Sequence, residues 1–89
     1  MIYKLELTPK TQADLRGYAK GGDKQKLRKI ESLFEELRSH PETGTGKPEC
    51  LKHEYSGLWS RRIDDKNRLI YKIEEKTVTV FVVSAKGHY

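Results

Sequence analysis

The sequence lacks several features that would point to particular classes of protein. Cys50 is the only cysteine, which excludes an intramolecular disulfide and a metal cluster held by several thiolates. No stretch approaches the roughly 20 apolar residues of a membrane-spanning helix, and Lys4 and Glu6 stand where a signal peptide would need an apolar core. A glycine-rich phosphate-binding loop is also missing. We therefore expect a cytoplasmic protein with no membrane segment and no cofactor.

Positive charge, by contrast, is abundant. The 89 residues carry a formal net charge of +5, and 35% of them are charged. A cationic surface attracts polyanions, so nucleic acid is the first expected partner and an acidic protein the second. The length fits one domain over residues 1–89, with no repeats.

The first forty residues predict a strand and two helices. In residues 1–7, Tyr3, Leu5 and Leu7 alternate with Lys4 and Glu6, which is typical of a strand. Thr8 can cap a helix whose first turn holds Pro9, and Asp23 can cap a second helix after a Gly-Gly pair. The expected buried positions of the first helix are Thr11, Leu15, Tyr18 and Ala19, and those of the second are Leu27, Ile30, Leu33, Phe34 and Leu37. The second helix also has a basic half, Lys24, Lys26, Arg28 and Lys29, which is either a solvated face or a surface that docks on RNA or the ribosome.

The second half of the chain predicts a loop and three strands. The loop ends near Pro48, and the strands cover residues 58–63, 68–74 and 77–83, joined by tight turns. The apolar stripes of the helices need a sheet to pack against. The predicted fold class is therefore α+β, with two N-terminal helices on one face of a twisted, mainly antiparallel sheet, and Arg62 and Arg68 available on the other face.

Charged and titratable residues of this half could perform acid–base chemistry on a phosphate. Glu49 lies among lysines, which favours its ionised form, so it is either a weak proton acceptor or part of a surface ion pair with Lys47 or Lys52. Arg62 and Arg68 could stabilise developing negative charge.

Histidines supply the candidate proton donors. His88 can donate a proton near neutral pH, although it and Tyr89 could equally be frayed terminal residues. His53 competes for the same role. The histidines and Cys50 show no metal-ligand spacing, so no metal site is expected.

These residues resemble the YoeB family of bacterial toxins, within the wider RelE and ParE superfamily. The resemblance spans the chain and is densest at Gly46, Lys47, Pro48, Glu49, Leu51, Lys52, His53, Ser56, Gly57, Trp59, Ser60, Arg61, Arg62, Ile63, Arg68, Leu69 and Tyr71, and again at His88 and Tyr89. It implies a RelE-like fold and a toxin of a type II toxin–antitoxin system. Such a toxin cuts mRNA in the ribosomal 30S A site, without metal, by attack of the RNA 2′-hydroxyl on the adjacent phosphate.

The same resemblance implies roles for individual residues. Glu49 would be the general base, Arg68 the phosphate and transition-state stabiliser, and His88 the general acid. Tyr89 would stack on or orient a nucleotide, while Arg62, Lys52 and His53 would line the cleft. Gly87 precedes His88 and predicts a loose tail, in which His88 is placed only when RNA or the ribosome is bound.

The resemblance also implies partners. These are mRNA on the ribosome and an acidic, YefM-like antitoxin that folds over the cationic cleft. A homodimer is also compatible with the resemblance. Two alternatives remain open: a ParE-like toxin that inhibits DNA gyrase, and a non-catalytic RNA-binding module.

Overall fold

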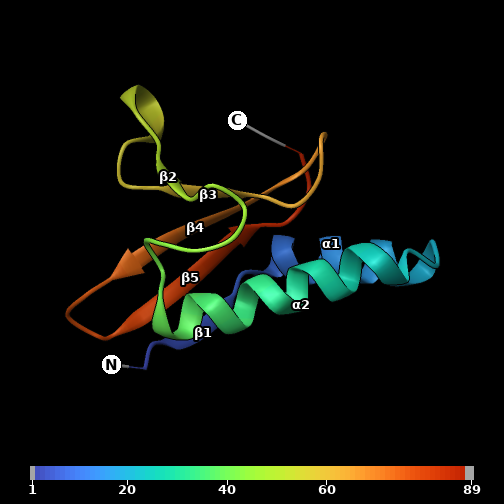
Figure 1. The fold of residues 1–89 in the computed structure, drawn as a ribbon, viewed down its shortest axis with the longest axis horizontal. Coiled ribbons are helices and arrows are strands. Elements are labelled where there is room, and N and C mark those ends of the chain that lie inside the picture. Colours follow the sequence, from blue (N-terminus) through green and yellow to red (C-terminus); the bar gives the residue numbers. More distant parts are fainter. Residues whose placement is uncertain (1, 88–89) are drawn as a thin grey trace.

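A five-stranded mixed sheet forms the centre of the described chain. The computed structural model describes residues 2–87 of the 89. The strands are β1 (Lys4–Leu7), β2 (Glu49–Cys50), β3 (Trp59–Arg62), β4 (Arg68–Glu74) and β5 (Thr79–Ser84). Their spatial order is β1-β5-β4-β3-β2, with β1 parallel to β5 and the other neighbours antiparallel (Figure 1).

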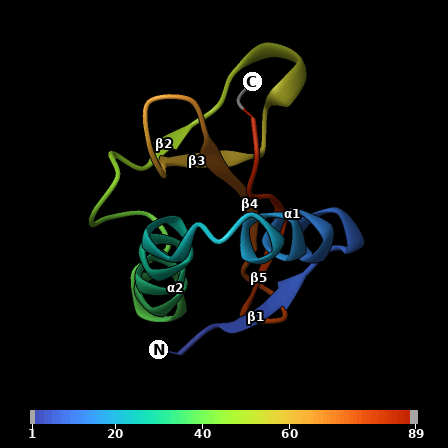
Figure 2. The ribbon, with the colours of Figure 1, turned by 90° about the vertical axis from the view of Figure 1, so that its right-hand side faces the viewer.

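Two helices follow β1 in the chain, and their ends are fixed by the predicted caps. Helix α1 spans Pro9–Lys20, and the Thr8 hydroxyl accepts the Thr11 amide at 3.2 Å. Helix α2 spans Lys24–Ser39, and the Asp23 carboxylate accepts the Lys26 amide at 3.1 Å. Figure 2 shows the two helices side by side, packed on one face of the sheet. The predicted α+β architecture is therefore confirmed.

The hydrophobic core lies between the helices and this face of the sheet. Its buried members from the helices are Tyr18, Ile30, Leu33 and Leu37, and those from the sheet are Leu69, Tyr71, Val80 and Val82. Burying such side chains stabilises the fold by about 1.5–3 kcal/mol each. None of the helices in residues 2–87 is long and apolar enough to cross a membrane.

Several details differ from the sequence-based expectations. Ala19 is exposed, because α1 turns it away from the sheet. The two-residue strand β2 and the short 3-10 helix η1 (His53–Tyr55) were not expected, since neither is long enough to show a periodic pattern. Arg61, on the helix-facing side of β3, is fully buried.

Candidate functional site

Strand register places three predicted site residues on one face of the sheet. Glu49 of β2 pairs with Ser60, and Ser60 pairs with Ile70. Arg62 pairs with Arg68 one step further along the same strands. Paired residues point to the same side of a sheet and next-but-one residues share a face, so the side chains of all these residues project together. This face is opposite the one covered by α1 and α2.

The charged groups of this face are available to a ligand. Glu49 and Arg62 are exposed and Arg68 is half-buried. None of the ion pairs found among residues 2–87 includes any of the three. The surface ion pair that was the alternative role for Glu49 is therefore not formed there. One carboxylate and two guanidinium groups on an open face can accept a proton and bind a phosphate.

Ser60 adds a polar atom to this face that sequence reasoning did not single out. Ser60 and its partner Ile70 are fully buried, so this face is covered there and is open to solvent at Glu49 and Arg62. The Ser60 hydroxyl has no hydrogen-bond partner among the described residues. Ser60 pairs with Glu49 of β2 on one side and with Ile70 of β4 on the other. Buried hydroxyls are normally paired, and the sequence carries no signal for this exception.

Lys52 and His53 lie on the segment that connects β2 to β3. Lys52 immediately precedes η1, His53 begins it, and both side chains are exposed. No hydrogen bond or ion pair of the described residues joins either one to Glu49, Arg62 or Arg68. They therefore belong to the connection that leaves the edge strand β2 and not to the strands that carry the three charged groups.

The end of the described chain lies beside Arg68. The Arg68 amide donates to the Gly87 carbonyl at 2.8 Å, and the Gly87 amide donates to the Asn67 side chain at 2.9 Å. Gly87 itself therefore forms two hydrogen bonds through its backbone, to the start of β4 and to the turn before it. The predicted site residues His88 and Tyr89 lie outside the described residues, so their placement stays a prediction.

Arg61 lies on the helix-facing side of the same strand, and its hydrogen bonds form a brace for the loop between α2 and β2. Its guanidinium donates to the Glu36 carboxylate at 2.8 Å and to three backbone carbonyls, those of His40, Thr43 and Thr45. These carbonyls belong to the loop between α2 and β2. A single buried arginine therefore fixes the loop that leads to Glu49.

Two further groups complete this brace. The Arg61 Nε donates to the Tyr71 hydroxyl at 3.2 Å, and that hydroxyl donates to the Pro41 carbonyl at 2.8 Å. Burial raises the pKa of Tyr71, so the hydroxyl keeps its proton. Burial also acts to raise the pKa of Glu36, but hydrogen bonds from Thr45 and Arg61 outweigh it, and the net pKa is lowered. The carboxylate therefore stays charged opposite Arg61.

Two glycines let the loop approach the brace and β3. Gly44 has a φ of +118°, and a Cβ there would lie 2.2 Å from Glu36 Oε1. Gly46 has a φ of +87°, and a Cβ there would lie 2.8 Å from the Arg62 carbonyl. The Gly46 carbonyl accepts the Arg62 amide at 2.7 Å. Only glycine fits either position without displacement, and the alternating glycines were the one sequence signal for this packing.

Metal-binding side chains do not cluster in the described part of the chain. No group of three or more histidine, cysteine, aspartate or glutamate residues there could hold a metal ion.

Comparisons with known proteins point to one family. Residues 7–89 match the family model described as the YoeB-like toxin of bacterial type II toxin–antitoxin systems. A curated relative, toxin YoeB of Mycobacterium bovis, is 45% identical over 67 residues, which are 75% of this chain and 76% of the relative.

Solved structures agree with this similarity. The YoeB/ParE toxin from Agrobacterium tumefaciens is 31% identical, with a TM-score of 0.90 over 97% of this chain and 99% of that one. YoeB from Staphylococcus aureus, solved as a dimer, is 30% identical with a TM-score of 0.84 and full coverage of both chains. The toxin in the heterotetrameric YoeB–YefM complex from the same organism is 30% identical, with a TM-score of 0.82 and full coverage of both chains.

Proposed function

Because the chain belongs to the YoeB-like toxin family of bacterial type II toxin–antitoxin systems, we propose that it is an endoribonuclease that cleaves mRNA in the ribosomal A site. The observation that carries this proposal is the strand register. It brings Glu49, Arg62 and Arg68 onto one open face, next to the point where the chain continues to its C-terminus.

The proposed reaction is a metal-independent transesterification. The Glu49 carboxylate takes the proton of a ribose 2′-hydroxyl, and the 2′-oxygen forms a bond to the adjacent phosphorus. The bond from phosphorus to the 5′-oxygen of the next nucleotide breaks, and His88 donates a proton to that oxygen. The products are a 2′,3′-cyclic phosphate and a 5′-hydroxyl. DNA, which lacks the 2′-hydroxyl, is not a substrate.

The cations contribute by stabilising charge and by positioning the substrate. Arg68 binds the phosphate and its transition state, and Arg62 lies directly opposite it across the strand pair. Lys52 and His53, on the exposed connection before β3, bind flanking phosphates, and Tyr89 stacks on a base. This chemistry places the protein in the cytoplasm, where ribosomes translate mRNA.

Primer extension on mRNA from a purified translation reaction tests the proposal. We expect truncation of the mRNA at the A-site codon with the unchanged protein and a large loss of truncation with Glu49→Gln. Glu6→Gln, which changes an exposed carboxylate on the opposite edge strand β1, is the matched control and should cleave normally. Inhibition of gyrase without truncation would support the ParE-like alternative, and neither activity would leave an RNA-binding module.

An antitoxin is the second proposed partner. The open face carries Arg62 and Arg68 without ion pairs among residues 2–87, and an acidic peptide could neutralise them. The structure of the S. aureus relative in complex with YefM supports a YefM-like partner here. The structure of a dimer of the same relative supports a homodimer. Adding the product of a neighbouring acidic gene should abolish truncation, and light scattering should show whether the toxin alone is dimeric. An acidic product that leaves truncation unchanged would contradict this pairing.

A further inference from the structure

We propose that Asp14 and Tyr18 of α1 are positioning residues that hold the C-terminal tail in place, and through it the proton donor of the proposed cleavage. This inference rests on the proposed function, because it assigns the tail a role in that reaction. It concerns helix α1, to which the mechanism above gives no part.

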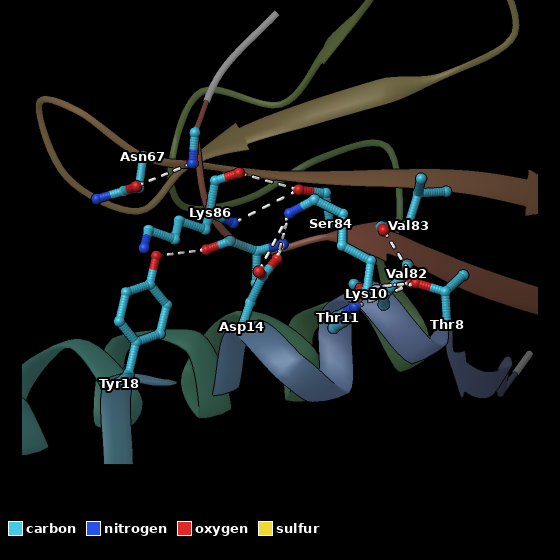
Figure 3. Close-up of polar contacts among 12 residues, drawn as sticks. Thr8, Lys10, Thr11, Asp14, Tyr18, Asn67, Val82, Val83, Ser84 and Lys86 are labelled. Atoms are coloured by element: carbon cyan, nitrogen blue, oxygen red, sulfur yellow. Dashed lines mark hydrogen bonds and ion pairs between the residues drawn. The ribbon is translucent and has the colours of Figure 1, made fainter. Parts of the chain in front are cut away.

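Both side chains form hydrogen bonds with the backbone of a single tail residue, Ala85. The Asp14 carboxylate accepts the Ala85 amide at 3.0 Å, and the Tyr18 hydroxyl donates to the Ala85 carbonyl at 2.7 Å (Figure 3). Asp14 and Tyr18 are four residues apart and so lie on the same side of the helix. Ala85 is fully buried. Both polar groups of its backbone are thus fixed by side chains from α1, directly after β5 ends at Ser84.

Each of the two groups has a further contact with a lysine. Lys10 Nζ lies 2.8 Å from the Asp14 carboxylate. Burial raises the pKa of Tyr18, against a lowering by the Lys26 ammonium, which lies 4.8 Å from the ring centroid. Tyr18 therefore keeps the proton that it donates to Ala85.

A second contact fixes the tail two residues later. Gly87 donates to the Asn67 side chain and accepts from the Arg68 amide, so the tail passes from α1 to the start of β4. Asn67 is itself held by Asp64, which accepts its amide at 2.7 Å, and Asp64 pairs with Lys26 of α2 at 3.1 Å. The last described residue is therefore held beside Arg68 by contacts that begin on both helices.

This arrangement matters for catalysis because a general acid must lie within hydrogen-bonding reach of the leaving oxygen. A displacement of about 1 Å can cost about 100-fold in rate. His88 is bonded directly to Gly87, so the anchoring of residues 85–87 limits where its backbone can begin. A loss of this anchoring lowers the rate of the chemical step without changing how tightly the mRNA and ribosome are bound.

A double-mutant cycle tests the inference by single-turnover cleavage of mRNA on ribosomes. We expect Tyr18→Phe to lower the cleavage rate at saturation by about 10-fold, with an unchanged half-saturating concentration. In a His88→Ala background the same substitution should have no further effect, because the group that it positions is gone. Tyr3→Phe, which removes an exposed hydroxyl contact with Glu75 at the far end of the sheet, is the matched control and should cleave normally.

Asp14 provides a second and independent pair of variants. Asp14→Asn keeps an oxygen that can accept the Ala85 amide, whereas Asp14→Ala does not. We therefore expect Asp14→Ala to slow the chemical step and Asp14→Asn to restore most of the rate. Amide exchange of Ala85 and Gly87, followed by NMR, should become faster in Tyr18→Phe and Asp14→Ala.

Three outcomes would overturn the inference. They are an unchanged rate in Tyr18→Phe, an equal loss in both His88 backgrounds, or a failure of Asp14→Asn to restore activity. If the unchanged protein cleaves no mRNA, the proposed function itself fails. Cleavage that proceeds normally in both Tyr18→Phe and Asp14→Ala refutes only the positioning role.

Discussion

Arg61 and Arg62 are adjacent in β3, but the first is buried and the second is exposed. Arg61 points toward the helices, has a side chain that is 0% exposed, and donates hydrogen bonds to Glu36, to Tyr71 and to backbone carbonyls. Arg62 points to the open face and forms no ion pair among the described residues. The alternation of a β-strand is the whole cause of this difference. One face of the sheet therefore holds the loop before β2, and the other presents charge to a ligand.

This separation explains how so small a domain can present exposed charge at a defined position. Glu49 lies in a strand of only two residues, which offers little hydrogen bonding of its own. The preceding loop is instead fixed from behind by Arg61 and from the side by the bond between Gly46 and Arg62. The residue that fixes the loop and the residues proposed to perform the chemistry thus lie on opposite faces of the same sheet.

The largest expected effect comes from removing Arg61, the buried arginine of the pair. Arg61→Ala should lower the free energy of unfolding by about 3–5 kcal/mol, because the Glu36 carboxylate and three part-buried backbone carbonyls lose their hydrogen bonds to the buried guanidinium. Chemical denaturation followed by circular dichroism measures this. Arg62→Ala should leave the denaturation midpoint almost unchanged, and an equal loss in both variants would contradict the distinction between the two faces.

The next effect concerns the open face. Arg68→Ala should reduce single-turnover cleavage of ribosome-bound mRNA by about 10²–10³-fold, the usual result of removing one donor that stabilises transition-state charge. Arg16→Ala, on the exposed side of α1, is the matched control. A loss of the same size in both variants would indicate a general charge effect rather than a specific role.

A smaller effect tests the hydroxyl within the brace. Tyr71→Phe removes the acceptor of Arg61 Nε and the donor to the Pro41 carbonyl, and should cost about 1–2 kcal/mol of unfolding free energy. Urea denaturation measures this difference. Because the ring and its packing remain, the m-value should stay unchanged. A neutral result would mean that the hydroxyl contributes nothing to the loop.

The smallest effect depends on pH. Burial acts to raise the pKa of Asp64, but hydrogen bonds from Lys66, Lys26 and Asn67 outweigh it and lower the pKa from 3.8 to about 2. A lowered folded-state pKa stabilises the fold above about pH 4, and this contribution disappears as the pH falls toward 2. The Asp64 side chain is 38% exposed, so solvent screening reduces the contribution to about 0.5 kcal/mol.

Thermal melts of Asp64→Asn test this small contribution. The variant should melt a few °C below the unchanged protein at pH 7, and the gap should close near pH 2. Asn can still accept the two backbone amides, so the comparison isolates the charge. A gap that does not change with pH would show that the carboxylate charge has no part in it.

Sequence patterns predicted those parts of the fold that depend on neighbouring residues. The caps at Thr8 and Asp23 and the apolar stripe of α2 are local signals, and both helices were predicted from them. The parallel pairing of β1 with β5 joins segments more than seventy residues apart, which no local pattern records. The burial of Arg61 was missed for a related reason, since its acceptors are backbone carbonyls that only the folded loop brings together.

The candidate site divides in the same way. Residue types and the family resemblance selected Glu49, Arg62 and Arg68, while the strand register was needed to place them on one face. The family resemblance is confirmed by the comparisons. The roles of these residues, and those of His88, Tyr89, Lys52 and His53, stay predictions. Neither the sequence nor the resemblance indicated the contacts of Asp14 and Tyr18 with the tail.

One substrate change tests the central claim most directly, namely that the open face performs RNA chemistry through the ribose hydroxyl. An mRNA with a single 2′-deoxynucleotide on the 5′ side of the A-site cut should be bound by the toxin and ribosome but not cleaved. The all-ribose mRNA should yield a fragment ending in a 2′,3′-cyclic phosphate. Cleavage of the deoxy-substituted mRNA at an undiminished rate would contradict the account.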